Sequence, residues 1–154
     1  MSKKNKKFYL QCNSCGQKIE DFDIWFKNRQ RCPSCGDNKA DVIYPDGMAG
    51  IEDLLHDKDS RFSGLWRYFD YLPLNKKENI VSCGEGIVPI DRWRFLEKFA
   101  KENHGIRCKV FAHRHDDNFA TGTFKDLAGS MIASVLKENN IKTYVTASTG
   151  NVGV

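Results

Sequence analysis

Four cysteines near the N-terminus form two Cys-x-x-Cys pairs at Cys12, Cys15, Cys32 and Cys35. Two thiolates at this spacing can occupy adjacent corners of one tetrahedron, and two such pairs complete a Cys₄ zinc site that has no open position for water. A glycine follows each pair and relieves the backbone where it folds around the sulfurs. Disulfides are the competing interpretation, but they require an oxidising compartment that nothing in the sequence indicates. The spacing therefore predicts a structural zinc ribbon.

The second residue that could do chemistry is Lys125, in the segment Thr121-Gly122-Thr123-Phe124-Lys125-Asp126. Apolar residues recur downstream at helical spacing, and Thr123 with Asp126 has the form of a capping box. These features predict a helix over about residues 124–139, with Lys125 in its first turn. The helix dipole disfavours a cation there, and a neutral lysine amine is the nucleophile that condenses with an aldehyde. The alternative is a surface lysine whose amine reaches water.

A predicted strand over residues 141–147 follows this helix and leads directly into the turn Ser148-Thr149-Gly150-Asn151. The order helix, strand and glycine-containing turn is that of an α/β unit. Backbone amides in such a turn can bind an anion, particularly where the turn opens another helix. The apolar pattern further predicts that Met131 and Val135 are buried against a parallel sheet.

These two motifs, with the helix and strand between them, resemble the β family (fold type II) of pyridoxal-phosphate enzymes, in particular its threonine-synthase-like branch. The segment around Gly84-Glu85-Gly86 is similar to a third family motif, and some members carry an N-terminal zinc ribbon. The resemblance implies that Lys125 holds pyridoxal 5'-phosphate covalently and shuttles protons, and that Asn151 contacts the ring hydroxyl of the cofactor. It also implies a substrate-carboxylate site at Ser148, Thr149, Gly150 and Asn151.

The reaction that the resemblance implies is elimination of phosphate from a phosphorylated amino acid and its replacement by water. Glu85 is either a site residue or a structural carboxylate that accepts turn amides. The motifs cover only the first part of the family pattern. We therefore expect a truncated enzyme, half of a split enzyme that a second chain completes, or a remnant. A function of another class, a non-catalytic zinc-ribbon interaction module, also fits the cysteines.

The expected fold class is α/β, with parallel-sheet units preceded by the zinc ribbon. Within the ribbon, alternation of Phe22, Ile24 and Phe26 predicts a short strand. A turn at Pro45-Asp46-Gly47 marks the boundary of the module. The predicted parts are a flexible basic tail over 1–7, the ribbon over 8–44 and an incomplete catalytic region over 45–154.

Several further elements are predicted in the central region. The aromatic-rich stretch over 63–74 is expected to pack in a core, since few basic residues lie near it to make a nucleic-acid platform. A helix capped by Asp91 should end near Gly105, and a strand should follow over 107–112. Cys83 and Cys108 belong to no pattern and are expected to be buried as small hydrophobic residues.

Composition narrows the classes of function. The chain has 154 residues, 40% of them hydrophobic, and a net charge of +4 to which a lysine-rich N-terminus contributes. We interpret this N-terminus as a solubilising tail and not as a nucleic-acid arm. Because no apolar run approaches the about 18 residues of a membrane span, we expect a soluble cytoplasmic protein without a membrane partner.

Overall fold

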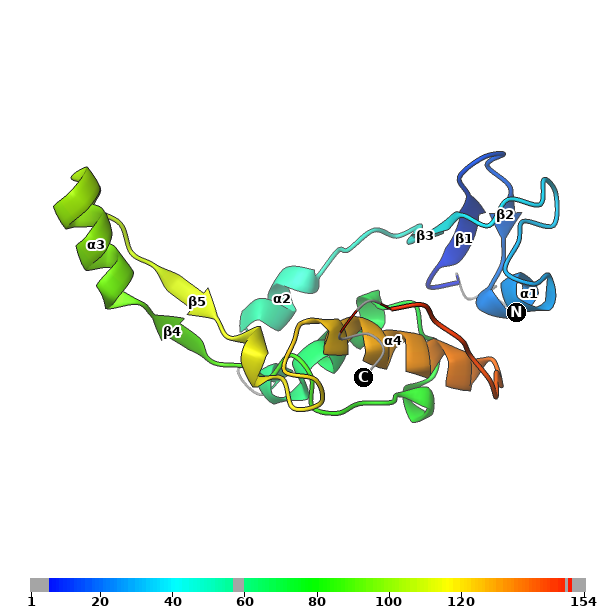
Figure 1. Cartoon of the computed structure of the whole chain (residues 1–154). Coiled ribbons are helices and arrows are strands. Elements are labelled where there is room, and N and C mark those ends of the chain that lie inside the picture. The colour runs from blue at the N-terminus through cyan, green and yellow to red at the C-terminus, as the bar shows by residue number, and fades with distance from the viewer. Residues whose placement is uncertain (1–5, 57–59, 149, 151–154) are drawn as a thin grey trace.

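The computed structural model describes residues 6–56, 60–148 and 150. The molecule is elongated, and its helices and strands are arranged along its length (Figure 1). A small cysteine-bearing module lies at one end, a projecting arm at the other, and a long helix, α4 (Lys125–Glu138), lies between them. No helix in the described ranges is long and apolar enough to cross a membrane.

The N-terminal module is built on a three-stranded antiparallel sheet with the order β2-β1-β3. Its strands are β1 (Tyr9–Cys12), β2 (Lys18–Ile19) and β3 (Ala40–Ile43). Alternate residues of β1 point inward, so that Leu10 and Cys12 are almost fully buried. At the end of the predicted tail, Lys7 donates a hydrogen bond to the Leu74 carbonyl at 2.9 Å.

The strand predicted at Phe22, Ile24 and Phe26 is wrong, because these residues form helix α1 (Phe22–Lys27). Asp21 accepts a hydrogen bond from the Ile24 amide at 3.0 Å and caps the helix. Phe22 and Phe26 are four residues apart, which places their side chains on one face of the helix. The alternating pattern was thus compatible with both structures, and the cap selected the helix.

The middle of the chain contains α2 (Ile51–His56) and two 3₁₀ segments, η1 (Ser60–Tyr71) and η2 (Lys77–Asn79). The aromatic-rich stretch does pack in the core, as predicted, since Phe69, Leu74 and Val135 form a buried cluster. Partly buried side chains surround this cluster: Phe22, Phe26, Trp66, Ile80 and Met131. The predicted turn before this region is present, because the Gly47 amide donates to the Tyr44 carbonyl at 3.1 Å.

The projecting arm, residues 90–113, consists of β4 (Ile90–Arg92), α3 (Arg94–His104) and β5 (Phe111–His113), and its two strands pair antiparallel. Helix α3 ends at Gly105, as predicted, in the left-handed conformation with φ 67°. Asp91 is not its cap, since it lies in β4 and pairs with Arg114 at 2.8 Å. The second strand is shorter and later than predicted.

Helix α4 agrees with its predicted bounds to within a residue at each end, although Phe124 and not Thr123 occupies the cap position. Val135 is buried and Met131 half-buried, but they pack against the aromatic cluster and not against a parallel sheet. Both sheets in the described ranges are antiparallel. The fold is therefore a small mixed α/β arrangement.

Two other predictions also fail. Residues 141–147 have no regular secondary structure, because a β-strand exists only through hydrogen bonds to a neighbouring strand. Cys83 and Cys108 are exposed, not buried. Cys83 lines a cavity, and Cys108 lies on the projecting arm between α3 and β5.

Candidate active site and zinc centre

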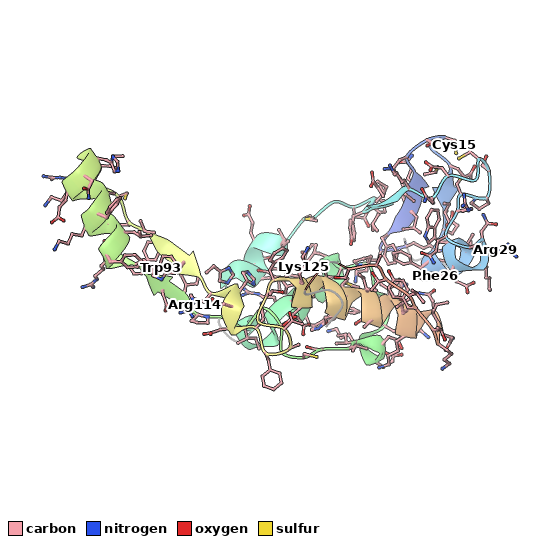
Figure 2. The ribbon with its side chains drawn as sticks, in the orientation of Figure 1. Cys15, Phe26, Arg29, Trp93, Arg114 and Lys125 are labelled. Atoms are coloured by element: carbon pink, nitrogen blue, oxygen red, sulfur yellow. The ribbon has the colours of Figure 1, made fainter. Side chains whose placement is uncertain are left out.

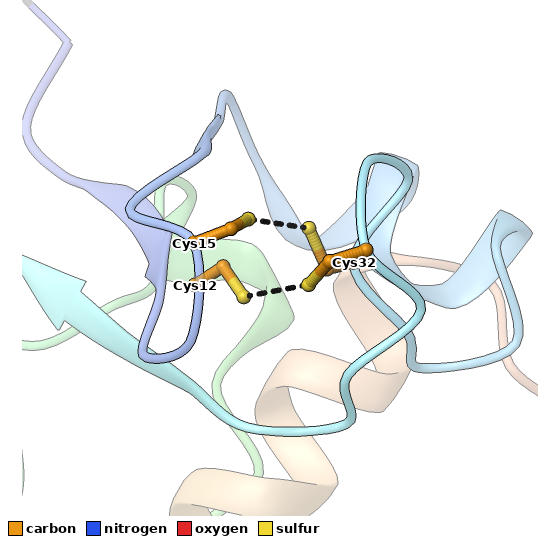
Figure 3. Close-up of side chains that lie close together, drawn as sticks. Cys12, Cys15 and Cys32 are labelled. Atoms are coloured by element: carbon orange, nitrogen blue, oxygen red, sulfur yellow. Dashed lines mark hydrogen bonds between the residues drawn. The ribbon is translucent and has the colours of Figure 1, made fainter.

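The four cysteines meet at one point of the N-terminal module (Figure 3). Each pair lies in a tight turn of the same form: the Gly16 amide donates to the Cys12 carbonyl at 3.0 Å, and the Gly36 amide to the Cys32 carbonyl at 2.9 Å. All four sulfur atoms lie within 4.8 Å of one another. The closest contacts run between the pairs, Cys12 to Cys35 and Cys15 to Cys32, each with 3.6 Å between the sulfurs.

These distances fit zinc, and the four cysteines form no disulfide in this structure. A tetrahedral zinc ion with zinc–sulfur bonds of about 2.3 Å places its ligand sulfurs about 3.8 Å apart, whereas a disulfide requires about 2.05 Å. Backbone hydrogen bonds from Cys35 and Ser34 lower the pKa of the Cys32 thiol to about 7, whereas hydrogen bonding with Cys15 and burial raise the pKa of the Cys35 thiol to about 12. The donor set and its geometry therefore suit a closed structural zinc site.

Lys125, the first residue of α4, lies beside a separate cavity of about 230 Å³ (Figure 2). Its side chain is exposed, and its amine lies 4.9 Å from the centre of the Phe124 ring. An amine in this position can reach a small aldehyde that enters the cavity. The residues that line the cavity are Val81, Cys83, Glu85, Ala120, Thr121, Lys125, Asp126, Gly129, Ser130 and Ala133.

Asp126 holds the loop that leads into Lys125. Its carboxylate accepts hydrogen bonds from the Thr121 amide at 3.1 Å and from the Thr121 hydroxyl. Burial opposes ionisation of this acid, but the bonds from Thr121 outweigh it and lower the pKa of Asp126. Thr123 instead accepts from the Lys125 amide at 3.2 Å. The capping-box residues are thus used, though Asp126 pairs with Thr121 and not with Thr123.

Glu85 is a buried structural carboxylate, one of the two roles open from the sequence. It accepts from the Ser130 hydroxyl at 2.6 Å, the Cys83 amide at 2.8 Å and the Ser82 hydroxyl at 3.0 Å. Gly64 lies so close to this turn that a β-carbon there would sit 2.1 Å from the Glu85 carbonyl oxygen. The turn is therefore held by α4 on one side and by the η1 backbone on the other.

Sequence reasoning missed three polar residues that position the site. The Asn118 side chain accepts from the Gly86 amide at 2.9 Å and donates to the Thr123 carbonyl at 3.0 Å, which joins the two loops. Ser130 and Ser134 are buried on α4, and Ser134 accepts from the Val81 amide at 2.8 Å. The spacing of four from Asp126 to Ser130 to Ser134 was a visible signal of one polar helix face.

Of the predicted carboxylate-binding turn, the structure describes Ser148 and Gly150. Ser148 accepts a hydrogen bond from the Gly150 amide at 3.1 Å, which is the form of a tight turn. Neither Ser148 nor Gly150 is among the residues that line the Lys125 cavity. Thr149 and Asn151 lie outside the described residues, so their predicted roles stay predictions.

Comparisons with known proteins identify the group to which the chain is related. It is 32% identical to threonine synthase of Methanocaldococcus jannaschii over 136 residues, which cover 79% of this chain and 32% of that protein. It is 26% identical to threonine synthase of Methanosarcina acetivorans over 94% of this chain and 32% of the relative. It is also 24% identical to cysteate synthase of Methanococcoides burtonii over 95% of this chain and 31% of the relative.

No protein-family model matches the chain, and no solved structure gives a significant match. The chain spans about a third of the length of these curated relatives. The similarity extends over both the cysteine module and the Lys125 region, since two of the alignments cover nearly all of the chain. The chain is therefore related, at modest identity, to threonine and cysteate synthases, which are pyridoxal-phosphate enzymes of fold type II.

Proposed function

We propose that this chain supplies the lysine-bearing portion of a pyridoxal-phosphate enzyme of the threonine-synthase or cysteate-synthase kind. The proposed reaction is elimination of phosphate from a phosphorylated amino acid and its replacement by water. The observation that carries the proposal is the Lys125 amine, exposed beside a cavity in a chain whose relatives are named as these synthases.

In this proposal Lys125 holds the cofactor and then moves a proton at the α-carbon of the substrate. Pyridoxal phosphate, when bound, supplies the electron sink that stabilises negative charge at that carbon. Asp126 and Asn118 hold the loop before Lys125, so the backbone that carries the lysine has a defined position. The turn at Ser148, Thr149, Gly150 and Asn151 binds the substrate carboxylate.

We further propose that polypeptide corresponding to the rest of the relatives, in the same or another chain, completes the site. The arm supports this proposal because its apolar side chains have no cover: Phe95 is 65% exposed, Phe111 60% and Ile90 66%. A two-stranded sheet is only marginally stable by itself. Trp93 also lies on this arm, away from the rest of the molecule (Figure 2). An adjoining strand or helix would bury this surface.

The lysine proposal is tested by incubating the chain with pyridoxal phosphate, reducing with borohydride and locating the modified lysines by mass spectrometry. We expect modification at Lys125, with an absorbance change that dialysis reverses if reduction is omitted. Lys125→Ala should abolish the change, whereas Lys137→Ala, at the other end of α4, should not. Equal loss of the absorbance change in the two variants would show that Lys125 is not the specific site of cofactor attachment.

The completion proposal is tested by mixing the chain with the part of the Methanocaldococcus jannaschii threonine synthase that it does not match. We expect the mixture to retain cofactor through dialysis and the isolated chain to show no turnover. Stable retention and turnover by the isolated chain would show that no further polypeptide is needed.

A further inference from the structure

The cysteine module and the lysine helix share one hydrophobic interface. Phe22 and Phe26 of α1 pack against the cluster that contains Val135 of α4. Figure 2 shows Phe26 on the side of the module that faces α4. A hollow of about 250 Å³ lies along this contact, and both elements contribute to its walls. Its lining residues include Trp25 and Phe26 from α1, and Met131, Ile132 and Leu136 from α4.

Polar contacts join the segments that border this interface. Lys7 donates to the carbonyls of Leu74 and Phe69, and its amine lies 4.1 Å from the centre of the Phe69 ring. Burial lowers the pKa of Lys7, while Asp70 and Glu138 oppose this shift. Near the C-terminal end of α4, Glu138 accepts from the Lys76 amide at 2.9 Å. The module and the C-terminal half of the Lys125 helix meet at the walls of the hollow that both line.

Inside the cysteine module, the Phe8 ring contacts Phe22 of α1, with 5.7 Å between the ring centres, but the core of the module is small. Its buried apolar residues are few, and two of them are cysteines of the metal cluster: Phe8, Leu10, Cys12, Ile19 and Cys32. Helix α1 has 6 residues, which is too short to be stable alone. It lies between the two cysteine pairs, so closing the cluster fixes both ends of the segment that carries it. Metal binding in modules this small supplies the free energy of folding.

We propose that zinc binding at Cys12, Cys15, Cys32 and Cys35 orders the C-terminal half of α4 through Phe22 and Phe26. The ribbon then supports the helix that carries Lys125, and the aromatic face of α1, Phe22 and Phe26, packs against the core. Loss of zinc releases α1, uncovers Met131 and Val135 and loosens the helix. This inference goes beyond the proposed function and does not rest on it, because its test measures helix order and not catalysis.

The test is hydrogen exchange, measured by mass spectrometry on the full chain with zinc and after removal of zinc by a chelator under reducing conditions. We expect amides of residues 8–44 to lose protection without zinc. The protection factors of amides 131–138 should fall by at least about tenfold, because one or two half-buried aromatic rings no longer pack against this part of the helix. Amides of α3 serve as an internal control, because the arm is remote from the module (Figure 1). Adding zinc back should restore the protection of both sets of amides.

Matched variants separate the interface from the metal. Phe26→Ala should retain zinc, as measured by metal analysis, yet lower the protection of α4, and Phe26→Leu should recover part of it. Ile24→Ala is the control, since Ile24 lies on α1 outside the cluster. Unchanged α4 protection after zinc removal or in Phe26→Ala would overturn the inference, as would a ribbon that stays protected without metal.

Discussion

Replacing Glu85 by alanine tests the buried network that joins the turn at residues 82–86 to α4. The carboxylate accepts three hydrogen bonds, from Ser130, Cys83 and Ser82. In the alanine variant Ser130 can still donate to the Val81 carbonyl, and the exposed Ser82 can bind water. The Cys83 amide loses its acceptor, and the missing side chain leaves a cavity. One lost bond to a charged acceptor costs about 1.5–3 kcal/mol, so with the cavity we expect a loss of about 2–4 kcal/mol in the free energy of unfolding.

Glutamine at position 85 should be far milder. Its carbonyl oxygen can accept from Cys83 and Ser82, and its amide can donate to the Ser130 hydroxyl, which then donates to Val81. We expect a loss of about 1 kcal/mol or less. Urea unfolding followed by tryptophan fluorescence measures both variants, because Trp66 packs against the core. Glu78→Ala, at an exposed acid, is the control. Equal effects of Glu85→Ala and Glu78→Ala would refute the reasoning.

Three further predictions follow from the cysteine cluster, the core and the arm. Metal analysis of the reduced protein should find about one zinc per chain, and Cys32→Ser should unfold residues 8–44; a ribbon that stays folded in this variant would show that its core suffices. Met131→Ala should lower the free energy of unfolding by about 1–2 kcal/mol, below the value for a fully buried methionine, whereas thermal unfolding of Val145→Ala, at an 87% exposed site, should match the parent chain. Arg92, with the Val110 amide, lowers the pKa of Glu97 from 4.5 to about 2. Because the folded pKa lies below the unfolded value, this stabilisation is complete above pH 4.5 and is lost as the pH falls toward 2. The helix content of the arm should fall as the pH drops from 4.5 toward 2, and in Glu97→Gln it should no longer depend on pH over this range. The same pH dependence in the variant as in the parent chain would contradict the role given to Glu97.

The cysteine cluster and the lysine helix could be predicted from sequence because each depends on local spacing. The two cysteine pairs set the sulfur positions within their own turns, and the predicted cluster is the one that forms. Apolar periodicity located α4, and Gly105 marked the end of α3 because the left-handed conformation favours glycine. These features need no partner distant in the sequence.

Contacts between distant segments decided the rest. Residues 141–147 have strand-forming side chains, but a strand forms only where another strand accepts its hydrogen bonds. The buried face of α4 is partly polar because Ser130 donates a hydrogen bond to Glu85, 45 residues away in the sequence. Packing of Phe22 and Phe26 against the cluster of Phe69, Leu74 and Val135 favoured a helix for residues whose alternation equally suited a strand. Sequence spacing thus determined which cysteines come together and which residues follow Lys125 along its helix. Tertiary structure determined the direction of the sheet strands and the partners of the buried polar groups, because each of these needs a surface that another part of the chain provides.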